Sequence, residues 1–291
     1  MSSSAVLLVN PISGTFNEKN IRIAEDILRK KDYDVEVFLS SKKGEIESLA
    51  KGSVEMSPDI VFVMGGDGTF NEAVNGLVHS EVPVAFIPSG TTNVLARELD
   101  IPLKVGRAVE MAVNGKVHRI SLGKVITDDE RIRYFILMAG AGYDAETVYS
   151  VSTSLKSVSG KAAYILNGLR VLSRYSPEPI TIRTDGDEIT GYTVIAGNSS
   201  CYGGRLKMTP DASLFSPYLY LYALRTPSRA SIIGTLIGMF TGSHVRGKNV
   251  SYFRCRSIRL EGSSHVQVDG DHLCRLPIEI FVEKECLNIV N

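Results

Sequence analysis

Residues 59–77, DIVFVMGGDGTFNEAVNGL, are the stretch that decides the fold. The run IVFVM at 60–64 is short, apolar and rich in β-branched side chains, which predicts a strand buried on both faces. From Thr69 onward, the apolar residues Phe70, Ala73, Val74 and Leu77 recur at helical spacing and predict a helix. The strand is therefore expected to pass through a Gly-Gly-Asp-Gly-Thr loop into a helix.

The loop between this strand and this helix has the composition of a phosphate-binding loop. Glycine lets the backbone approach a ligand closely, because no Cβ stands in the way and positive φ costs little. Loop amides and the helix N-terminus carry partial positive charge, which suits a phosphate. An ordinary glycine turn is the alternative, but five specified residues followed by Asn-Glu favour a nucleotide site. Within it, Asp67 is expected to orient a metal or a ribose hydroxyl, and Thr69 offers a donor and an acceptor.

Composition limits the classes of protein to consider. The chain has 291 residues, 44% hydrophobic and 22% charged, which predicts one large folded domain or two ordinary ones. The formal net charge of zero argues against a nucleic-acid binder that works by bulk charge. Four cysteines without metal-like spacing favour a reduced, intracellular protein. The start lacks a signal peptide's basic region, and the longest apolar stretch, 230–240, cannot span a bilayer, so membrane contact is expected to be peripheral.

The first half of the chain alternates strands with helices. Strands are predicted at 5–9, 33–39 and 82–87, and helices at about 20–30, 46–50, 94–99 and 105–113. Two of the strands end in polar loops, NPISG from Asn10 and PSGTTN at 88–93. Ligands of open α/β sheets collect at the carboxyl ends of strands, so these loops are candidates to join the GGDGT loop. Asn-Pro is equally a simple turn, and Ser40 is equally a helix N-cap.

From about residue 124 the sequence changes to strands rich in Tyr, Thr, Ile and Val. Residues 180–184 and 188–196, around Asp185-Gly186, predict a β-hairpin with a type I′ turn. Further strands are predicted at 132–138, 218–224, 250–253, 257–260, 265–268 and 277–282. The fold class is therefore α/β: a Rossmann-like open α/β domain at residues 1–123, followed by a mainly antiparallel β-sandwich domain at 124–284. Residues 285–291 are expected to return to the first domain.

Two predicted helices interrupt the second half. The first, about 155–172, lies in a window from 147 to 177 that holds four cations and no acid. An ordinary solvated face is expected there, with contact to nucleotide phosphates or anionic lipid as the alternative. The second, 228–240, is apolar on every side, which favours a buried helix over a lipid-facing one.

Other chemistry-bearing patterns are weaker. Residues 140–145, GAGYDA, match G-x-G-x-x-A, but the acid expected about 20 residues later is missing, so we reject a dinucleotide site. The chain has no Walker P-loop and no nucleophile elbow. Its five histidines show no metal-binding spacing and are expected to be surface or hydrogen-bonded residues.

The string GGDGTFNEAVNGL resembles the signature of the diacylglycerol kinase catalytic-domain family, which includes bacterial lipid kinases and sphingosine kinases. GGDGT alone also occurs in NAD kinases and 6-phosphofructokinases, whereas the continuation NExxNGL favours the lipid kinases. The family's other motifs follow in order over nearly the whole chain. They are the NPxxG opening at Asn10, PxGTxN at 88–93, Gly203-Gly204 before Pro210, and a DG-acid segment at 269–271.

The resemblance implies a lipid kinase of the diacylglycerol kinase type, a phosphotransferase with an alcohol group as acceptor. Its cofactors would be ATP and Mg²⁺, and its active site would lie in a cleft between the two domains. The nucleotide-binding residues implied are Asn10, Ser40, Gly65, Gly66, Asp67, Gly68, Thr69, Glu72, Gly90, Thr91 and Asn93. Magnesium would meet Asp67 through the nucleotide phosphates. Asp271 is implied as the general base that removes the proton of the lipid hydroxyl, and Asp67 and Asp269 as further catalytic carboxylates.

The chain departs from the family pattern at four positions. Val94 stands where an aspartate commonly helps to hold the substrate head group, and Ser121 where another joins the active-site carboxylates. Ser216 replaces an aspartate that binds a structural magnesium, so no structural metal is expected. Asp271 replaces a glutamate and is one methylene shorter, so the fold must bring it closer to the hydroxyl.

The sequence thus predicts a cytoplasmic, peripherally membrane-associated kinase of diacylglycerol or a related lipid. Its partners would be the lipid and a membrane surface, with no nucleic acid and with a homodimer as an open possibility. Two alternatives remain: a kinase for a soluble acceptor such as NAD, and a nucleotide-binding protein that has lost kinase activity through its four departures.

Overall fold

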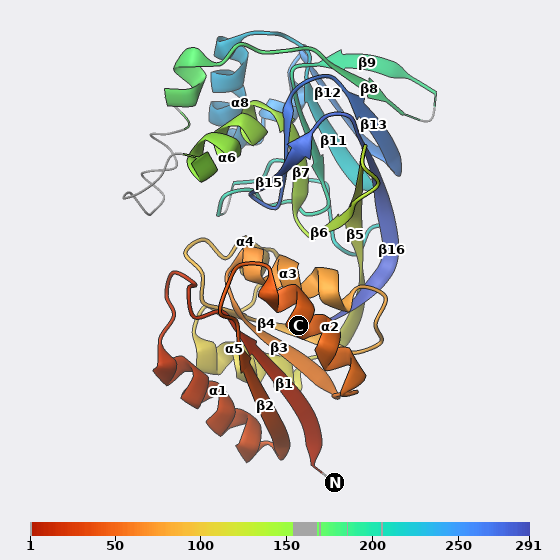
Figure 1. The fold of residues 1–291 in the computed structure, drawn as a ribbon. Coiled ribbons are helices and arrows are strands. Elements are labelled where there is room, and N and C mark those ends of the chain that lie inside the picture. Colours follow the sequence, from red (N-terminus) through yellow and green to blue (C-terminus); the bar gives the residue numbers. More distant parts are fainter. Residues whose placement is uncertain (1, 154–167, 169, 185, 205) are drawn as a thin grey trace. The chain divides into compact units, whose positions relative to one another are not determined.

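A computed structural model shows the fold and describes residues 2–153, 168, 170–184, 186–204 and 206–291 (Figure 1). The chain divides into two compact units. The first comprises Met1–Leu122, Gly203–Arg205 and Lys284–Asn291, and the second comprises Gly123–Tyr202 and Leu206–Glu283. Strands β5 (Val117–Thr127) and β16 (Ile278–Val290) each have residues in both units.

The first unit is built on a parallel sheet with the strand order β2-β1-β3-β4. The strands are β1 (Ser3–Val9), β2 (Tyr33–Leu39), β3 (Ile60–Gly65) and β4 (Val84–Pro88), and the end of β16 pairs in parallel with β4. The helices are α1 (Glu18–Lys30), α2 (Glu45–Glu55), α3 (Asp67–Leu77), α4 (Val94–Glu98) and α5 (Val105–Asn114). The strand and helix alternation predicted for this half is confirmed.

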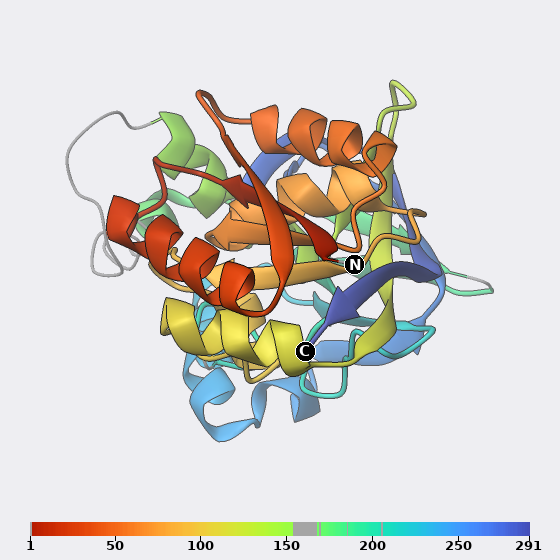
Figure 2. The same ribbon diagram turned by 90° about the horizontal axis from the view of Figure 1, so that it is seen from below.

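Helices cover both faces of this sheet, as Figure 2 shows. One face packs against α1 and α5 in a cluster that includes Leu28, Phe62 and Val109. The other face meets α2 and α3, which also contact each other. Every residue of β3 is buried, as its run of apolar side chains predicts.

The order of the strands fixes where a ligand can bind in this unit. From β1 the chain moves outward to β2, and then returns past β1 to β3 on the other side. In doubly wound sheets the crevice lies at the carboxyl ends of the strands where the order reverses. That position is the end of β1 and β3, where the NPISG and GGDGT segments begin.

The second unit contains two antiparallel sheets. One has the order β12-β11-β10-β7-β14-β15, and the other joins β9, β8, β13 and β16, with β5 paired to β16 and β6 paired to β5. The strands not yet bounded are β6 (Ile132–Phe135), β7 (Met138–Gly142), β8 (Ile180–Arg183), β9 (Glu188–Gly191), β10 (Thr193–Gly197), β11 (Leu219–Leu224), β12 (Val250–Cys255), β13 (Ser257–Glu261), β14 (His265–Val268) and β15 (Asp271–Arg275). Helices α6 (Tyr143–Thr153) and α8 (Arg229–Thr241) and the short 3₁₀ helix η1 (His244–Arg246) complete the described elements.

The two sheets of the second unit pack face to face. A single apolar cluster takes side chains from both, for example Ile182 and Leu260 from one sheet and Leu221 and Val266 from the other. Alternate residues of each strand point into this cluster, which is the arrangement of a β-sandwich. The predicted fold class, an open α/β domain followed by an antiparallel sandwich, is confirmed.

Two predicted strands are each divided between the sheets. Residues 132–138 form β6 and β7, because the amides of 136–138 bond to the Asp269 carboxylate where the chain changes sheet. Residues 188–196 likewise form β9, which pairs with β8, and β10, which pairs with β7 and β11. The hairpin at 180–191 is confirmed, while Asp185 in its turn lies outside the described residues.

The helices of the second unit differ more from expectation. Helix α6 was not predicted, and most of the helix predicted at 155–172 lies outside the described residues. The helix predicted at 228–240 is present as α8, but its expected burial is wrong: Ile233, Leu236, Ile237 and Phe240 are exposed. Among the described residues, no helix is long and apolar enough to cross a membrane.

Candidate functional site

Three loops meet at the carboxyl ends of β1, β3 and β4 in the first unit. Asn10 donates from Nδ2 to the Thr69 hydroxyl at 2.9 Å, and its Oδ1 accepts the amide of Ile12 at 2.9 Å. The Ser13 and Ser89 hydroxyls lie 3.0 Å apart. The Ser89 carbonyl also accepts the Thr15 hydroxyl at 2.7 Å. Hydrogen bonds of side chains to side chains and to backbone therefore join the segments that the sequence singled out.

Asp67 holds two of these loops together. It is the first residue of α3, and its carboxylate accepts the amides of Val94 and Leu95, each at 3.0 Å. These amides belong to the first turn of α4, where no intrahelical acceptor exists. Burial raises the pKa of Asp67 above its ordinary value, and the amides of Leu95 and Val94 oppose that rise. The acid of the GGDGT loop thus fixes the start of α4, and its predicted contact with a metal remains a prediction.

Glycine is required where the two loops touch. A Cβ on Gly90 would lie 2.5 Å from the Cα of Gly66 and 2.7 Å from Oδ1 of Asn93. Real Cβ atoms do not approach backbone that closely, so residue 90 must be glycine, and a Cβ on Gly66 would itself lie only 3.2 Å from the Cα of Gly90. Asn93 has a left-handed backbone with φ of +48° and closes the second loop by accepting the Gly90 amide at 2.9 Å.

The remaining predicted nucleotide residues surround the same loops. Glu72 is buried and accepts the amide of Gly44, the N-cap of α2, at 3.0 Å. Ser40 is buried directly after β2. Because the N-cap of α2 is Gly44, the alternative interpretation of Ser40 as that N-cap is wrong. Thr91 is exposed, and a Cβ on Gly14 would lie 2.5 Å from its hydroxyl oxygen. The structure therefore brings Thr91 against the NPISG loop.

Two of the positions that depart from the family pattern lie in the first unit. Val94 is buried, and its backbone amide donates a hydrogen bond to the Asp67 carboxylate. Ser121 is buried in β5, and its hydroxyl accepts the amide of Glu285 from β16 at 3.4 Å. In the second unit, Ser216 accepts the Tyr218 amide at 3.2 Å, as a turn residue does. Among the residues that the structure describes, no group of three or more His, Cys, Asp or Glu is placed to hold a metal.

The second unit presents the Asp269-Gly270 turn, which joins β14 to β15. Both residues have positive φ, +48° and +85°, as the predicted hairpin turn requires. The Asp269 carboxylate accepts three backbone amides in a row, those of Ile136, Leu137 and Met138, at 2.8–2.9 Å. These contacts give Asp269 a structural role, and its catalytic role remains a prediction. Asp271 is exposed at the start of β15.

A buried carboxylate supports this turn from the other side. Asp144, at the start of α6, accepts the hydroxyl of Tyr202 and the Nε2 of Gln267, the latter at 2.7 Å. Gln267 in turn accepts the amide of Gly270 at 2.8 Å. Burial raises the pKa of Asp144, against the effect of both hydrogen bonds. The turn before Asp271 is therefore fixed by two acids, only one of which the sequence singled out.

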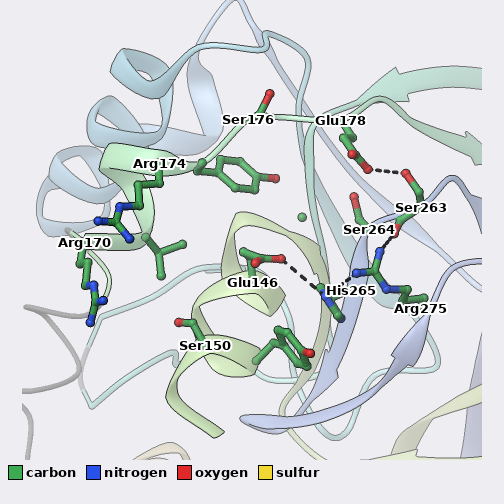
Figure 3. A pocket seen from close by; sticks show the side chains of 14 residues that line it. Glu146, Ser150, Arg170, Arg174, Ser176, Glu178, Ser263, Ser264, His265 and Arg275 are labelled. Atoms are coloured by element: carbon green, nitrogen blue, oxygen red, sulfur yellow. Dashed lines mark hydrogen bonds and ion pairs between the residues drawn. The ribbon is translucent and has the colours of Figure 1, made fainter. Parts of the chain in front are cut away.

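A pocket of about 490 Å³ opens beside the same hairpin, and Figure 3 shows its lining. His265 lies between Arg275, whose guanidinium donates to Nε2 at 3.0 Å, and His272, 2.9 Å from Nδ1. With Nε2 accepting, His265 carries its proton on Nδ1 and donates to His272. Burial lowers the pKa of His265 to about 4, with the Arg275 and His272 charges adding to the effect. The Tyr149 ring stacks on the His265 ring, with the two ring centroids 3.9 Å apart.

Sequence reasoning missed Asp144, Gln267 and the His265–His272 pair. Asp144 lies in the GAGYDA segment, where a strand does pass into a helix as the rejected motif would have it. The two histidines flank the predicted turn at 269–270, so cross-strand pairing across that turn was the signal available.

The family model described as Diacylglycerol kinase catalytic domain matches residues 4–125, and the YegS C-terminal NAD kinase beta sandwich-like domain matches residues 138–291. A protein of Bacillus subtilis named diacylglycerol kinase is 30% identical, with 94% of this chain and 92% of that protein covered. One of Staphylococcus saprophyticus with the same name is 28% identical over 99% and 98% of the two chains.

Solved structures show the same fold. A crystal structure titled as a diacylglycerol kinase from Bacillus anthracis has a TM-score of 0.80 at 22% sequence identity, covering 99% of this chain and 96% of that one. Another structure from that organism has a TM-score of 0.82 at 21% identity, covering 99% and 95%.

Proposed function

Because the chain belongs to the diacylglycerol kinase catalytic-domain family, we propose that it is a lipid kinase that phosphorylates the hydroxyl of diacylglycerol or a related lipid, with ATP as phosphoryl donor. One observation carries the proposal within the chain itself. The loops after β3 and β4 are joined by the Asp67 carboxylate and by the Gly66–Gly90 crossing, and Asn10 joins the loop after β1 to Thr69, at the switch point of a doubly wound sheet.

The backbone of the first unit supports the proposed binding of a triphosphate. The N-terminus of α3 directs the first-turn amides of an 11-residue helix at the carboxyl end of β3. Asn10 and Thr69 are hydrogen-bonded to each other, and they place a side-chain amide and a hydroxyl at the same edge of the sheet. A magnesium ion carried by the nucleotide phosphates would offset their charge, and Asp67 is the carboxylate available to it in this loop. Positioning and electrostatics supply most of the catalysis in phosphoryl transfer.

The second unit supplies the base in this proposal. Asp271 removes the proton of the lipid hydroxyl, the hydroxyl oxygen forms the new bond to the γ-phosphorus, and ADP leaves. The support is positional: Asp271 is exposed and follows a turn that Asp269 and Gln267 hold through four backbone amides. A carboxylate on a rigid turn is suited to general-base catalysis, for which position matters before pKa.

The test compares phosphorylation of diacylglycerol by wild type, Asp271→Ala and Asp271→Glu. Loss of a general base is expected to lower kcat by about 10²–10⁴-fold. Glutamate, the residue of the family pattern, is expected to retain turnover. Asp128→Ala, at another exposed turn of the same unit, is the matched control. Equal lipid-dependent rates in wild type and Asp271→Ala would remove the assigned base, and turnover with NAD but with no lipid would remove the proposed acceptor class.

A further inference from the structure

Helix α8 has an outward face of four apolar side chains. Ile233, Leu236, Ile237 and Phe240, here called the outer face, are exposed by 44%, 38%, 64% and 76%. Their spacing of i, i+3, i+4 and i+7 places them on one side of the helix. A solvated surface helix carries charged side chains at such positions. This face therefore has the composition of a contact surface.

The opposite side of α8 already has its own partners. Ile232 and Met239 are buried, and Thr235 exchanges a hydrogen bond with the hydroxyl of the fully buried Tyr222 on β11 at 2.6 Å. Gly238 lets η1 pack against the helix, since a Cβ there would lie 2.9 Å from the His244 amide. The packing of α8 on the sheet is thus complete without its outer face.

Exposed cations precede and follow the outer face along the chain. α8 and η1 belong to the connection between the neighbouring strands β11 and β12, here called the excursion. At its two ends Leu224 pairs with Val250, and the amide of Arg225 donates to the carbonyl of Asn249 at 2.8 Å. The chain therefore leaves and returns at the same end of the sheet (Figure 1). The exposed basic residues of this excursion are Arg225, Arg229, Arg246 and Lys248.

No acid offsets these cations along the chain. From residue 212 to residue 260 the sequence contains neither Asp nor Glu. An apolar face with basic residues at its edges is the composition of helices that lie in the interface of an anionic bilayer. Being 13 residues long, α8 measures about 20 Å at 1.5 Å per residue, which suits a helix that lies in the surface.

We propose that the outer face of α8 docks the protein on the surface of a bilayer that contains anionic phospholipid. The inference deepens the proposed function, because a kinase whose acceptor is a bilayer lipid must reach that surface. A second copy of the chain fits less well. Four side chains exposed to these extents present on the order of 500 Å² of apolar surface, below the ~800 Å² that each partner of a stable interface buries.

The experiment measures flotation of the full chain with vesicles of phosphatidylglycerol and phosphatidylcholine, and with vesicles of phosphatidylcholine alone, without nucleotide. Wild type is expected to bind the anionic vesicles more strongly, and added salt is expected to weaken binding. Ile237→Ser/Phe240→Ser is expected to lower the partition coefficient by about tenfold or more, since the anchoring side chains are removed. Arg246→Gln/Lys248→Gln is expected to lower it about fivefold per charge on anionic vesicles only.

Ile132→Ser, which changes another exposed apolar residue of the second unit, is the matched control and is expected to bind as wild type. Unchanged binding by the α8 double variant, or no binding by wild type, would overturn the docking proposal. So would a dimer that the double variant converts to monomer while vesicle binding persists. Turnover of a monomeric short-chain diacylglycerol separates the two proposals: its absence refutes the kinase function and leaves docking standing.

Discussion

The Asp269 carboxylate is expected to stabilise the second unit by a large and measurable amount. It accepts the amides of Ile136, Leu137 and Met138, where the chain passes from β6 to β7. Oδ1 accepts two of these amides and Oδ2 the third. Asparagine can keep the two bonds at its oxygen, but its amide nitrogen would face the amide of Ile136. Asparagine also tolerates the left-handed backbone that this position has.

The magnitude follows from these contacts. Hydrogen bonds to a charged group contribute ~1.5–3 kcal/mol each, and neutral ones about half as much. Losing one bond and halving the strength of two is therefore expected to lower the free energy of unfolding by roughly 3–6 kcal/mol. For a unit of this size, each 1 kcal/mol corresponds to ~2–4 °C, so Asp269→Asn is expected to lower the unfolding temperature by roughly 6–24 °C.

Differential scanning calorimetry measures this shift, with Asp128→Asn as the control because Asp128 is an exposed turn aspartate of the same unit. The control is expected to unfold within about 1 °C of wild type, as exposed substitutions do. If Asp269→Asn unfolds at the wild-type temperature, the anchoring argument is refuted. If it does so and also loses turnover, Asp269 acts in catalysis and not in anchoring.

Three further predictions concern glycine packing and pH. Gly90→Ala is expected to abolish nucleotide binding by calorimetry, because its Cβ would meet the Cα of Gly66; wild-type affinity would contradict this. Asp144→Asn is expected to gain stability relative to wild type as pH rises from about 4 toward neutral, because the raised pKa makes the buried carboxyl stabilising only while protonated. The reverse trend in unfolding temperature would refute the raised pKa. His265, with its pKa lowered to about 4, is expected to destabilise wild type as pH falls below ~6.5, and His265→Gln is expected to remove that part of the acid dependence.

The first unit could be predicted almost entirely from sequence, because its signals are local. An unbroken run of apolar residues indicates a buried strand such as β3, and apolar residues that recur with a period of 3.6 indicate the helix that follows. The second unit could not be predicted to the same extent, because the residues of a strand do not specify which other strand it pairs with. The run from 132 to 138 is continuous in sequence, yet it belongs to two sheets, and what divides it is a carboxylate more than 130 residues away.

The candidate site shows the same limit for individual residues. Composition identified the GGDGT and DG-acid segments, but the backbone amides that donate to Asp67 and Asp269 lie on segments distant in sequence. The burial of α8 was misjudged for a related reason. An apolar helix is usually enclosed, and nothing local indicates that four apolar side chains on one side of it are exposed.

The two acids that the motifs single out most strongly share one physical role. Asp67 and Asp269 each bind consecutive backbone amides at the start of another segment, α4 in the first case and β7 in the second. A carboxylate in such a position compensates donors that no helix or sheet partner reaches, and it fixes the course of a loop. Activity lost on replacing either acid would therefore follow from displaced loops as readily as from lost chemistry. Asp271 differs from both because it is exposed and follows a turn that Asp269 and Gln267 hold, and for this reason we propose it for the chemical role.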